Sequence, residues 1–186
     1  MARNPLPQVG TIEVQVDRVT QLFDTLDPFP FRERDLDKQA EEYILGWARE
    51  LPKRGPIKII IHLPASEAAG EHARDIGKAF DRYFKDRSDA LGGELKELFR
   101  TGRFSLIIGV SVLALCIAAS QVISRAYGDA GVGADIGRFV SEGLIILGWV
   151  ANWRPIEIFL YDWWPLVRRR RLYRRLASAD VVLLPK

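Results

Sequence analysis

The sequence predicts an α/β fold class: a small β-α-β-α domain followed by a hairpin of two transmembrane helices. Two apolar segments, 104–123 and 136–153, flank a short polar loop, 124–135. About 20 apolar residues are needed to cross a hydrocarbon core of about 30 Å, so the first segment is long enough and the second is the shorter of the two. Upstream, two strand patterns alternate with two helix patterns. We therefore expect an α/β domain at 1–90 and a membrane hairpin at 104–153.

The first strand is predicted at 11–17, where polar and apolar residues alternate strictly. One face carries the apolar side chains Ile12, Val14 and Val16. Residues 19–31 follow and are rich in Phe and Pro. Pro28 and Pro30 prevent a continuous helix, because each removes a backbone donor and restricts the preceding residue. An ordered, aromatic loop is expected here.

A helix of about fourteen residues is predicted next, with Asp35 or Asp37 as its N-cap. Its apolar side chains recur with the helical period and would form one face. They are Ala40, Ile44, Trp47, Ala48 and Leu51. Pro52 ends the helix, because proline cannot continue the hydrogen-bond ladder.

Residues 57–63 predict a second strand, and a second helix follows it. The strand segment has few polar and several β-branched residues, which is typical of a strand covered on both faces. Pro64 ends it, and Ser66 is the expected cap of a helix whose apolar stripe extends to Phe84. Strand, helix and strand in this order indicate a right-handed crossover and two parallel strands.

Two strands alone make a marginal sheet, since about three are needed for independent stability. The tail, 177–186, contains Val181, Val182, Leu183 and Leu184 in succession. We predict that this tail supplies a third strand to the domain. The alternative is that a partner protein or a second copy completes the sheet.

The charge distribution predicts that both termini are cytoplasmic. Gly92 and Gly93 are expected to form a hinge before a connecting helix at 91–103, which carries Lys96, Arg100 and Arg103. The loop 124–135 has one arginine against two aspartates. Lys and Arg accumulate on the cytoplasmic side within roughly 15–20 residues of a span. The start of the chain has no apolar core, so no cleavable signal peptide is expected.

Residues 154–176 form a predicted interfacial segment that is rich in aromatic residues and arginine. Trp and Tyr favour the headgroup region, and the expected belt consists of Trp149, Trp153, Tyr161, Trp163 and Trp164. The basic cluster consists of Arg168, Arg169, Arg170, Arg171, Arg174 and Arg175. Such clusters attract anionic lipid headgroups at about 1 kcal/mol per residue. The alternative is that these arginines only fix the topology.

Polar and small residues within the spans suggest further interactions. Glu142 is a candidate functional residue, since ionisable groups within membranes are costly; alternatively, it reaches the outer headgroups. Arg154 and Glu157 have the spacing of a helical ion pair. Small-residue pairs four apart favour close helix packing or dimerisation. These pairs are Ser105 with Gly109 and Ala114 with Ala118.

No catalytic residue, metal-ligand set or cofactor motif is assigned. His62 ends the second strand, where open parallel sheets often place functional groups, and an enzymatic alternative would combine it with Asp17 and Asp35. The chain has only two histidines and lacks the spacing of known hydrolase or metal motifs. The acidic residues between 24 and 37 are interleaved with arginines and fit capping and ion pairing. The domain is slightly acidic, so nucleic acid is not an expected partner.

Two stretches resemble an uncharacterised family of small bacterial inner-membrane proteins. They are Leu26-Asp27-Pro28-Phe29-Pro30-Phe31-Arg32-Glu33-Arg34-Asp35-Leu36-Asp37 and Trp153-Arg154-Pro155-Ile156-Glu157-Ile158-Phe159-Leu160-Tyr161-Asp162-Trp163-Trp164-Pro165. The resemblance implies an inner-membrane location. It implies no activity and no functional residues.

These observations favour a noncatalytic interaction or scaffold module, anchored in the membrane and working with a protein partner or as a homo-oligomer. The aromatic loop 23–31 is the candidate contact surface. Its alternative is burial against the domain's own helices, which a small domain needs for its core. The two competing classes are a membrane-bound enzyme near His62 and a transporter or channel accessory subunit acting through Glu142.

Overall fold

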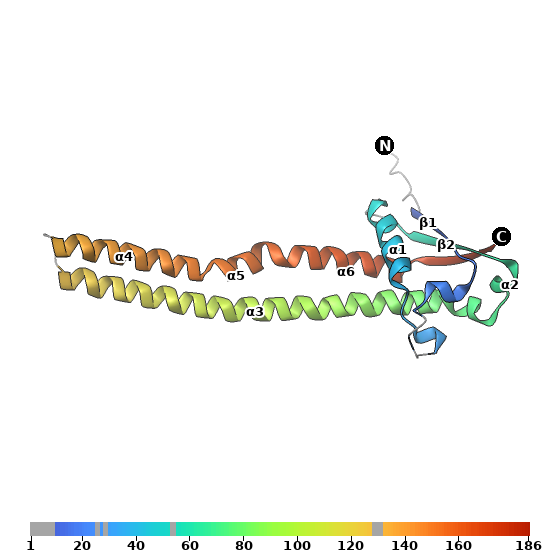
Figure 1. The fold of residues 1–186 in the computed structure, drawn as a ribbon, viewed down its shortest axis with the longest axis horizontal. Helices are drawn as coiled ribbons and strands as arrows, with labels where there is room; N and C mark the ends of the chain where they lie inside the picture. The colour runs from blue at the N-terminus through green and yellow to red at the C-terminus, as the bar shows by residue number, and fades with distance from the viewer. Residues whose placement is uncertain (1–9, 25–26, 28–29, 53–54, 128–131) are drawn as a thin grey trace, which may run out of the picture. The chain divides into compact units, whose positions relative to one another are not determined.

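The computed structural model describes residues 10–24, 27, 30–52, 55–127 and 132–186 and has mixed helix and sheet (Figure 1). The chain forms two compact units. The α/β unit comprises Met1–Gly92 and Arg168–Lys186, and the hairpin unit comprises Gly93–Val167. The predicted interfacial segment, 154–176, is divided between the two.

The α/β unit contains a three-stranded parallel sheet, which confirms the predicted third strand. Its strands are β1 (Gly10–Gln15), β2 (Ile57–Leu63) and β3 (Asp180–Pro185), in the order β1-β2-β3. Ile59 of the central strand pairs with Ile12 on one side and with Val181 on the other. The C-terminal tail therefore completes the sheet of its own chain.

One face of the sheet is buried and the other is open, so the prediction that β2 is covered on both faces is wrong. The side chains of Ile59, Ile61 and Leu63 are fully buried, whereas those of the alternating residues are half-buried. A Cβ at Gly77 of α3 (Ile76–Tyr127) would lie 4.0 Å from that of Val181, which places this helix on the buried face. The open face carries Thr11, Glu13, Gln15, Lys58, Ile60, His62, Asp180, Val182 and Leu184.

Helix α1 (Lys38–Glu50) begins where the sequence offers two caps, and the structure selects Asp37. Its Oδ1 accepts hydrogen bonds from the backbone N–H groups of Gln39 (2.8 Å) and Ala40 (3.4 Å). These satisfy donors that the first helical turn leaves unpaired. Gly55 lies in the following turn with φ of 125°, a conformation that favours glycine.

The second predicted helix is divided. A short α2 (Ala65–Ala68) is capped by Pro64 rather than Ser66, and a 3₁₀ segment, Glu71–Asp75, precedes α3. Helix α3 also contains the predicted connecting helix, 91–103, and the first apolar segment.

Gly92 and Gly93 are helical, so the prediction of a hinge at this pair is wrong. A Cβ at Gly92 would lie 3.0 Å from Nη2 of Arg170. The missing side chain thus makes room for an arginine that lies on the helix backbone.

In the core of the α/β unit, aromatic side chains connect helices α3 and α6. Phe84 is fully buried and lies with its ring centroid 5.4 Å from that of Tyr83 and 6.1 Å from that of Tyr173. The Tyr173 hydroxyl donates a 2.6 Å hydrogen bond to Glu41 of α1. Burial raises the pKa of Tyr173, so the hydroxyl keeps the proton that this bond requires.

After α4 (Val132–Ala151) the helical path is interrupted. Asn152 separates α4 from α5 (Trp153–Glu157), and a π-helical turn, Ile158–Asp162, precedes α6 (Trp163–Ala177). Pro155 lacks a backbone N–H and cannot continue the ladder from α4, which accounts for the break. The predicted second span therefore ends within a helix-to-helix junction.

Candidate functional site

The hairpin unit packs its helices along a seam of small and polar residues. On α3 the buried seam positions are Gly102, Gly109, Cys116 and Ser120, and on α4 and α5 they are Gly137, Ser141, Gly148, Asn152 and Pro155. The steps of three and four residues between most of these positions are typical of antiparallel helices that cross at a small angle. In this unit α3 and α4 run side by side (Figure 1).

The glycines of the seam allow the two backbones to approach closely. A Cβ added to Gly109 would lie 2.7 Å from Oδ1 of Asn152 and 2.9 Å from the carbonyl oxygen of Ala151. A Cβ added to Gly148 would lie 2.6 Å from Cδ1 of Leu113. Contacts this short leave no space for any side chain larger than hydrogen. Small residues serve this purpose between helices in lipid.

Two sets of polar side chains connect the helices. Nδ2 of Asn152 donates to the carbonyl oxygens of Gly109 (3.1 Å) and Gly148 (2.9 Å). Nearer the other end of α4, Oγ of Ser141 donates to the carbonyl oxygen of Ser120 at 3.3 Å. Asn152 and these serines were not predicted from the sequence. The sequence signal that could have identified them was the regular spacing of small and polar residues along otherwise apolar helices.

The outer surface of the hairpin unit is apolar. Phe104 is 68% exposed, Leu115 70% and Phe139 78%. Other exposed apolar residues of this unit are Leu106, Ile107, Ile108, Val110, Ile117, Val122, Ile136, Val140, Ile145, Ile146, Leu147 and Val150. A water-soluble helical pair buries such residues and exposes polar ones. In the hairpin unit the large apolar side chains are exposed, and the buried seam holds small and polar residues.

The residues of the predicted aromatic belt lie at different levels of the hairpin unit. Trp149 follows Gly148, which contacts Leu113 midway along 104–123, so it lies near the middle of the apolar surface. Tyr161 and Trp164 are exposed and lie beyond the last seam contact, between Gly102 and Ile158. Trp163 is half-buried, with its Nε1 donating to the carbonyl oxygen of Phe159. Trp153 is exposed.

Four of the charged residues of the hairpin unit bear on the predictions made above. Glu142 is exposed and follows Ser141, which places it level with Ser120, toward the end of the apolar segment that adjoins the loop 124–135. The predicted pair of Arg154 with Glu157 is present at 2.9 Å. Asp162 joins it at 3.2 Å, because the wider π-helical turn rotates this carboxylate back toward Arg154.

The basic cluster separates into structural and exposed arginines. Nη2 of Arg175 donates to the carbonyl oxygens of Pro52 (2.9 Å) and Gly55 (3.2 Å), and Arg170 is half-buried against Gly92. The exposed members are Arg168, Arg169, Arg171 and Arg174. Four cations are therefore accessible to an anionic surface, which is within the range that attracts acidic lipid.

Substitution of Arg175 and of the neighbouring Arg174 should have separable effects. Arg175→Ala removes two charge-assisted hydrogen bonds, so we expect the free energy of unfolding to fall by about 1.5–3 kcal/mol. Arg174→Ala should leave stability within about 0.5 kcal/mol of wild type, because this side chain is exposed, but should weaken retention of anionic lipid. Chemical unfolding and native mass spectrometry of the detergent-solubilised chain measure the two effects. Equal destabilisation by both variants would contradict this division.

His62 lies on the open face of the sheet, with its Nε2 3.5 Å from the carboxylate of Glu13. Asp17 and Asp35 are exposed, and no hydrogen bond or ion pair described in the structure joins either to His62. Within the described ranges, no group of three or more His, Cys, Asp or Glu side chains could hold a metal ion. The structure thus gives His62 a cross-strand neighbour, Glu13.

The described part of the aromatic loop packs inward. Phe23 is buried, with ring centroids 4.6 Å from Phe31 and 6.2 Å from Phe80 of α3. Phe31 in turn stacks on His72 at 4.5 Å. Leu26, Pro28 and Phe29 lie outside the described residues. The observed contacts agree with burial of this loop against the domain rather than with a free contact surface.

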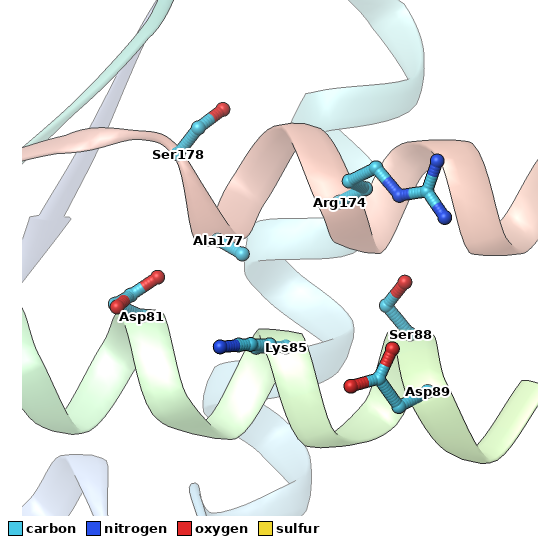
Figure 2. Close-up of a pocket in the computed structure, with 7 residues that line it drawn as sticks. All are labelled: Asp81, Lys85, Ser88, Asp89, Arg174, Ala177 and Ser178. Atoms are coloured by element: carbon cyan, nitrogen blue, oxygen red, sulfur yellow. The ribbon is translucent and has the colours of Figure 1, made fainter.

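A shallow cavity of about 270 Å³ lies between α3 and the end of α6 in the α/β unit (Figure 2). Its lining comes from both segments: Asp81, Lys85, Ser88, Asp89, Arg174, Ala177 and Ser178. Acidic and basic groups are mixed, so the lining selects neither anions nor cations. We assign it no ligand.

Comparison with models of protein families, with curated proteins and with solved structures gave no match.

Proposed function

We propose that this chain is a noncatalytic, membrane-anchored interaction or scaffold module that presents its α/β unit on the cytoplasmic side of the bacterial inner membrane. The observation that carries the proposal is the reversed polarity of the hairpin unit. Its seam holds glycine, serine and asparagine, while its surface holds the large apolar side chains. Exposing such a surface to water is unfavourable, and exposing it to lipid is not.

The dimensions of the helices support this anchor. The described chain has two helices long and apolar enough to cross a membrane, and only 17% and 22% of their most apolar stretches are buried. A helix from the core of a soluble protein would be mostly buried. The amide nitrogen of Asn152 and the hydroxyl of Ser141 in the seam both donate hydrogen bonds, as a hydrocarbon environment requires of polar groups.

The charges support the orientation. Lys96, Arg100 and Arg103 precede the first apolar segment, and the four exposed arginines of the basic cluster follow the hairpin in the sequence. Excess Lys and Arg favour the cytoplasmic side. Both termini, and with them the α/β unit, would then be cytoplasmic, with anionic headgroups as partners of the arginines.

A second candidate is an accessory subunit of a transporter or channel. The observation that favours it is Glu142, which is exposed within the apolar segment 136–153, four residues after the exposed Arg138. Its level near Ser120 lets the carboxylate reach the outer headgroups, so this position does not require transport.

Cysteine accessibility tests the proposed anchor and orientation. In a Cys116→Ala background, Asp135→Cys places a thiol at the last residue of the predicted outer loop, 124–135, and Ser178→Cys places one on the α/β unit; both positions are exposed. A membrane-impermeant maleimide should label the Asp135→Cys variant in intact spheroplasts and the Ser178→Cys variant only after lysis. The chain should also resist extraction by alkaline carbonate.

The outcomes are separable. Labelling of Ser178→Cys in intact spheroplasts would overturn the orientation, and extraction by carbonate would overturn the anchor. Native mass measurement of the solubilised chain then tests the interaction role. A copurifying protein or a homo-oligomer supports that role, and a bare monomer at cellular concentration contradicts it.

A further inference from the structure

The outer edge of β3 presents unpaired backbone groups. The N–H of Lys186 donates to the carbonyl oxygen of Leu63, so the even-numbered residues of this strand face β2. In a parallel sheet, the backbone N–H and C=O groups of successive residues point alternately to the two sides of a strand, so those of the odd-numbered residues point away from β2. The N–H and C=O groups of Val181 and Leu183 therefore point away from the sheet, and no hydrogen bond to them is present within the described residues.

The opposite edge of the sheet is protected. There the Tyr43 hydroxyl of α1 donates to the outward carbonyl oxygen of Glu13 at 3.3 Å. Native edge strands are normally blunted by charge, proline or a bulge. β3 carries a charge and a proline only at its two ends, Asp180 and Pro185, and the residues between them are the apolar Val181, Val182, Leu183 and Leu184. Its edge is thus a template for a further strand.

We propose that β3 pairs with β3 of a second copy, antiparallel and about a two-fold axis at Leu183. This deepens the proposed function by naming the partner as the chain itself. The two three-stranded sheets would form one continuous sheet. In this register Asp180 of each copy lies opposite Lys186 of the other, so both ends of the strand pair carry complementary charges.

The hydrogen-bonding groups match the same register. Leu183 of each copy donates to the carbonyl oxygen of Leu183 in the other, and Val181 donates to that of Pro185. Proline has no N–H, so both outward donors on each strand are satisfied. On the open face, Val182 of one copy meets Leu184 of the other, which covers an apolar side chain that is 41% exposed in the single chain.

Disulfide trapping in the full chain, in its membrane, tests the register. In a Cys116→Ala background, the double variant Asp180→Cys/Lys186→Cys should form a covalent dimer on mild oxidation, because Cα atoms of such a cross-strand pair lie about 4.5 Å apart. Either single variant should stay monomeric, since residue 180 of one copy lies six positions, about 20 Å, from residue 180 of the other. Thr11→Cys/Gln15→Cys, on the protected edge, is the matched control.

Charge reversal gives a second readout. Asp180→Lys or Lys186→Asp should weaken dimerisation on the order of tenfold, because each places like charges opposite each other at two positions. The double variant should restore dimerisation to within about threefold of wild type. Asp180 also lies opposite Lys58 in its own sheet, so unfolding of each variant is measured in parallel. A merely structural effect would not be rescued by the double variant.

A monomer, a dimer trapped equally well at the β1 control positions, or a different protein bound at this edge would each overturn the proposal. The cross-linking experiment tests the β3 pairing separately from the proposed membrane anchor. A chain that carbonate extracts but that cross-links at 180 and 186 disproves only the anchor. A chain that resists carbonate but does not cross-link disproves only the β3 pairing.

Discussion

Replacing Gly109 by isoleucine should separate the helices of the hairpin unit. The first atom of the new side chain would lie 2.9 Å from the carbonyl oxygen of Ala151, which is backbone and cannot rotate away. It would also displace the Asn152 amide, whose Nδ2 donates to Gly109. Overpacking of this kind costs about 1–3 kcal/mol and a lost interhelical hydrogen bond about 0.6 kcal/mol more, so we expect a loss of roughly 2–4 kcal/mol.

Gly143→Ile is the matched control, because a Cβ at Gly143 has no atom within 4 Å and this residue is exposed. It adds the same side chain to the same helix pair and should change stability by less than about 0.5 kcal/mol. Unfolding in mixed micelles of increasing SDS content, followed by tryptophan fluorescence, compares the two variants. Equal destabilisation would show that the close approach at Gly109 does not hold the helices together.

Only part of this seam was predictable from the sequence. The pairs Ser105 with Gly109 and Ala114 with Ala118 were expected to support either packing between the spans or dimerisation. Ala114 and Ala118 are exposed, so they do not pack between the two helices of the hairpin unit. The buried face instead continues from Gly109 to Cys116. Spacing of four places two small residues on one face of a helix, but the side chains of the partner decide which face is used. Those partner side chains belong to α4, which is distant in the sequence, so the spacing within α3 could not identify the buried face.

In the α/β unit, strands were easier to predict than helix boundaries. The alternation at 11–17 reflects burial of one sheet face, which the side-chain period of two records directly. The tail was predicted from its run of four apolar residues in an otherwise charged segment. The start of α3 at Ile76 instead depends on the turn at Gly70 and on packing. Glycine disfavours a helix by about 1 kcal/mol, yet Gly92 and Gly93 are both helical within the 52-residue α3, so local propensity did not decide the structure of this pair.

The division of the arginine cluster could not be predicted, since the six residues are chemically identical. Arg175 becomes structural only because the turn after α1 brings the carbonyl oxygens of Pro52 and Gly55 within reach. A count of positive charge in the sequence therefore overstates the number of exposed arginines. His62 was an alternative candidate because of its position at a strand end, and in the structure its neighbour is Glu13.

Phe84→Ala should unfold much of the α/β unit. This ring is fully buried among Phe80, Tyr83 and Tyr173, and truncation of a buried phenylalanine costs about 3–5 kcal/mol. Whole domains are stable by only about 5–15 kcal/mol, so this is a large share of the total. Hydrogen exchange of the backbone in β2 and β3, measured on the full chain, should show loss of protection.

Trp47→Ala provides the comparison, because it removes a larger ring from an exposed position on α1, where 48% of the side chain is accessible. Protection of β2 should stay close to wild type in this variant. The effect of Phe84→Ala on β3 is the sharper measurement. Tyr173 precedes β3 and contacts Phe84, so the C-terminal strand should lose protection together with β2. If β3 kept its protection while the aromatic core opened, the sheet alone would be holding the tail, and the core would not be what couples this strand to the helices.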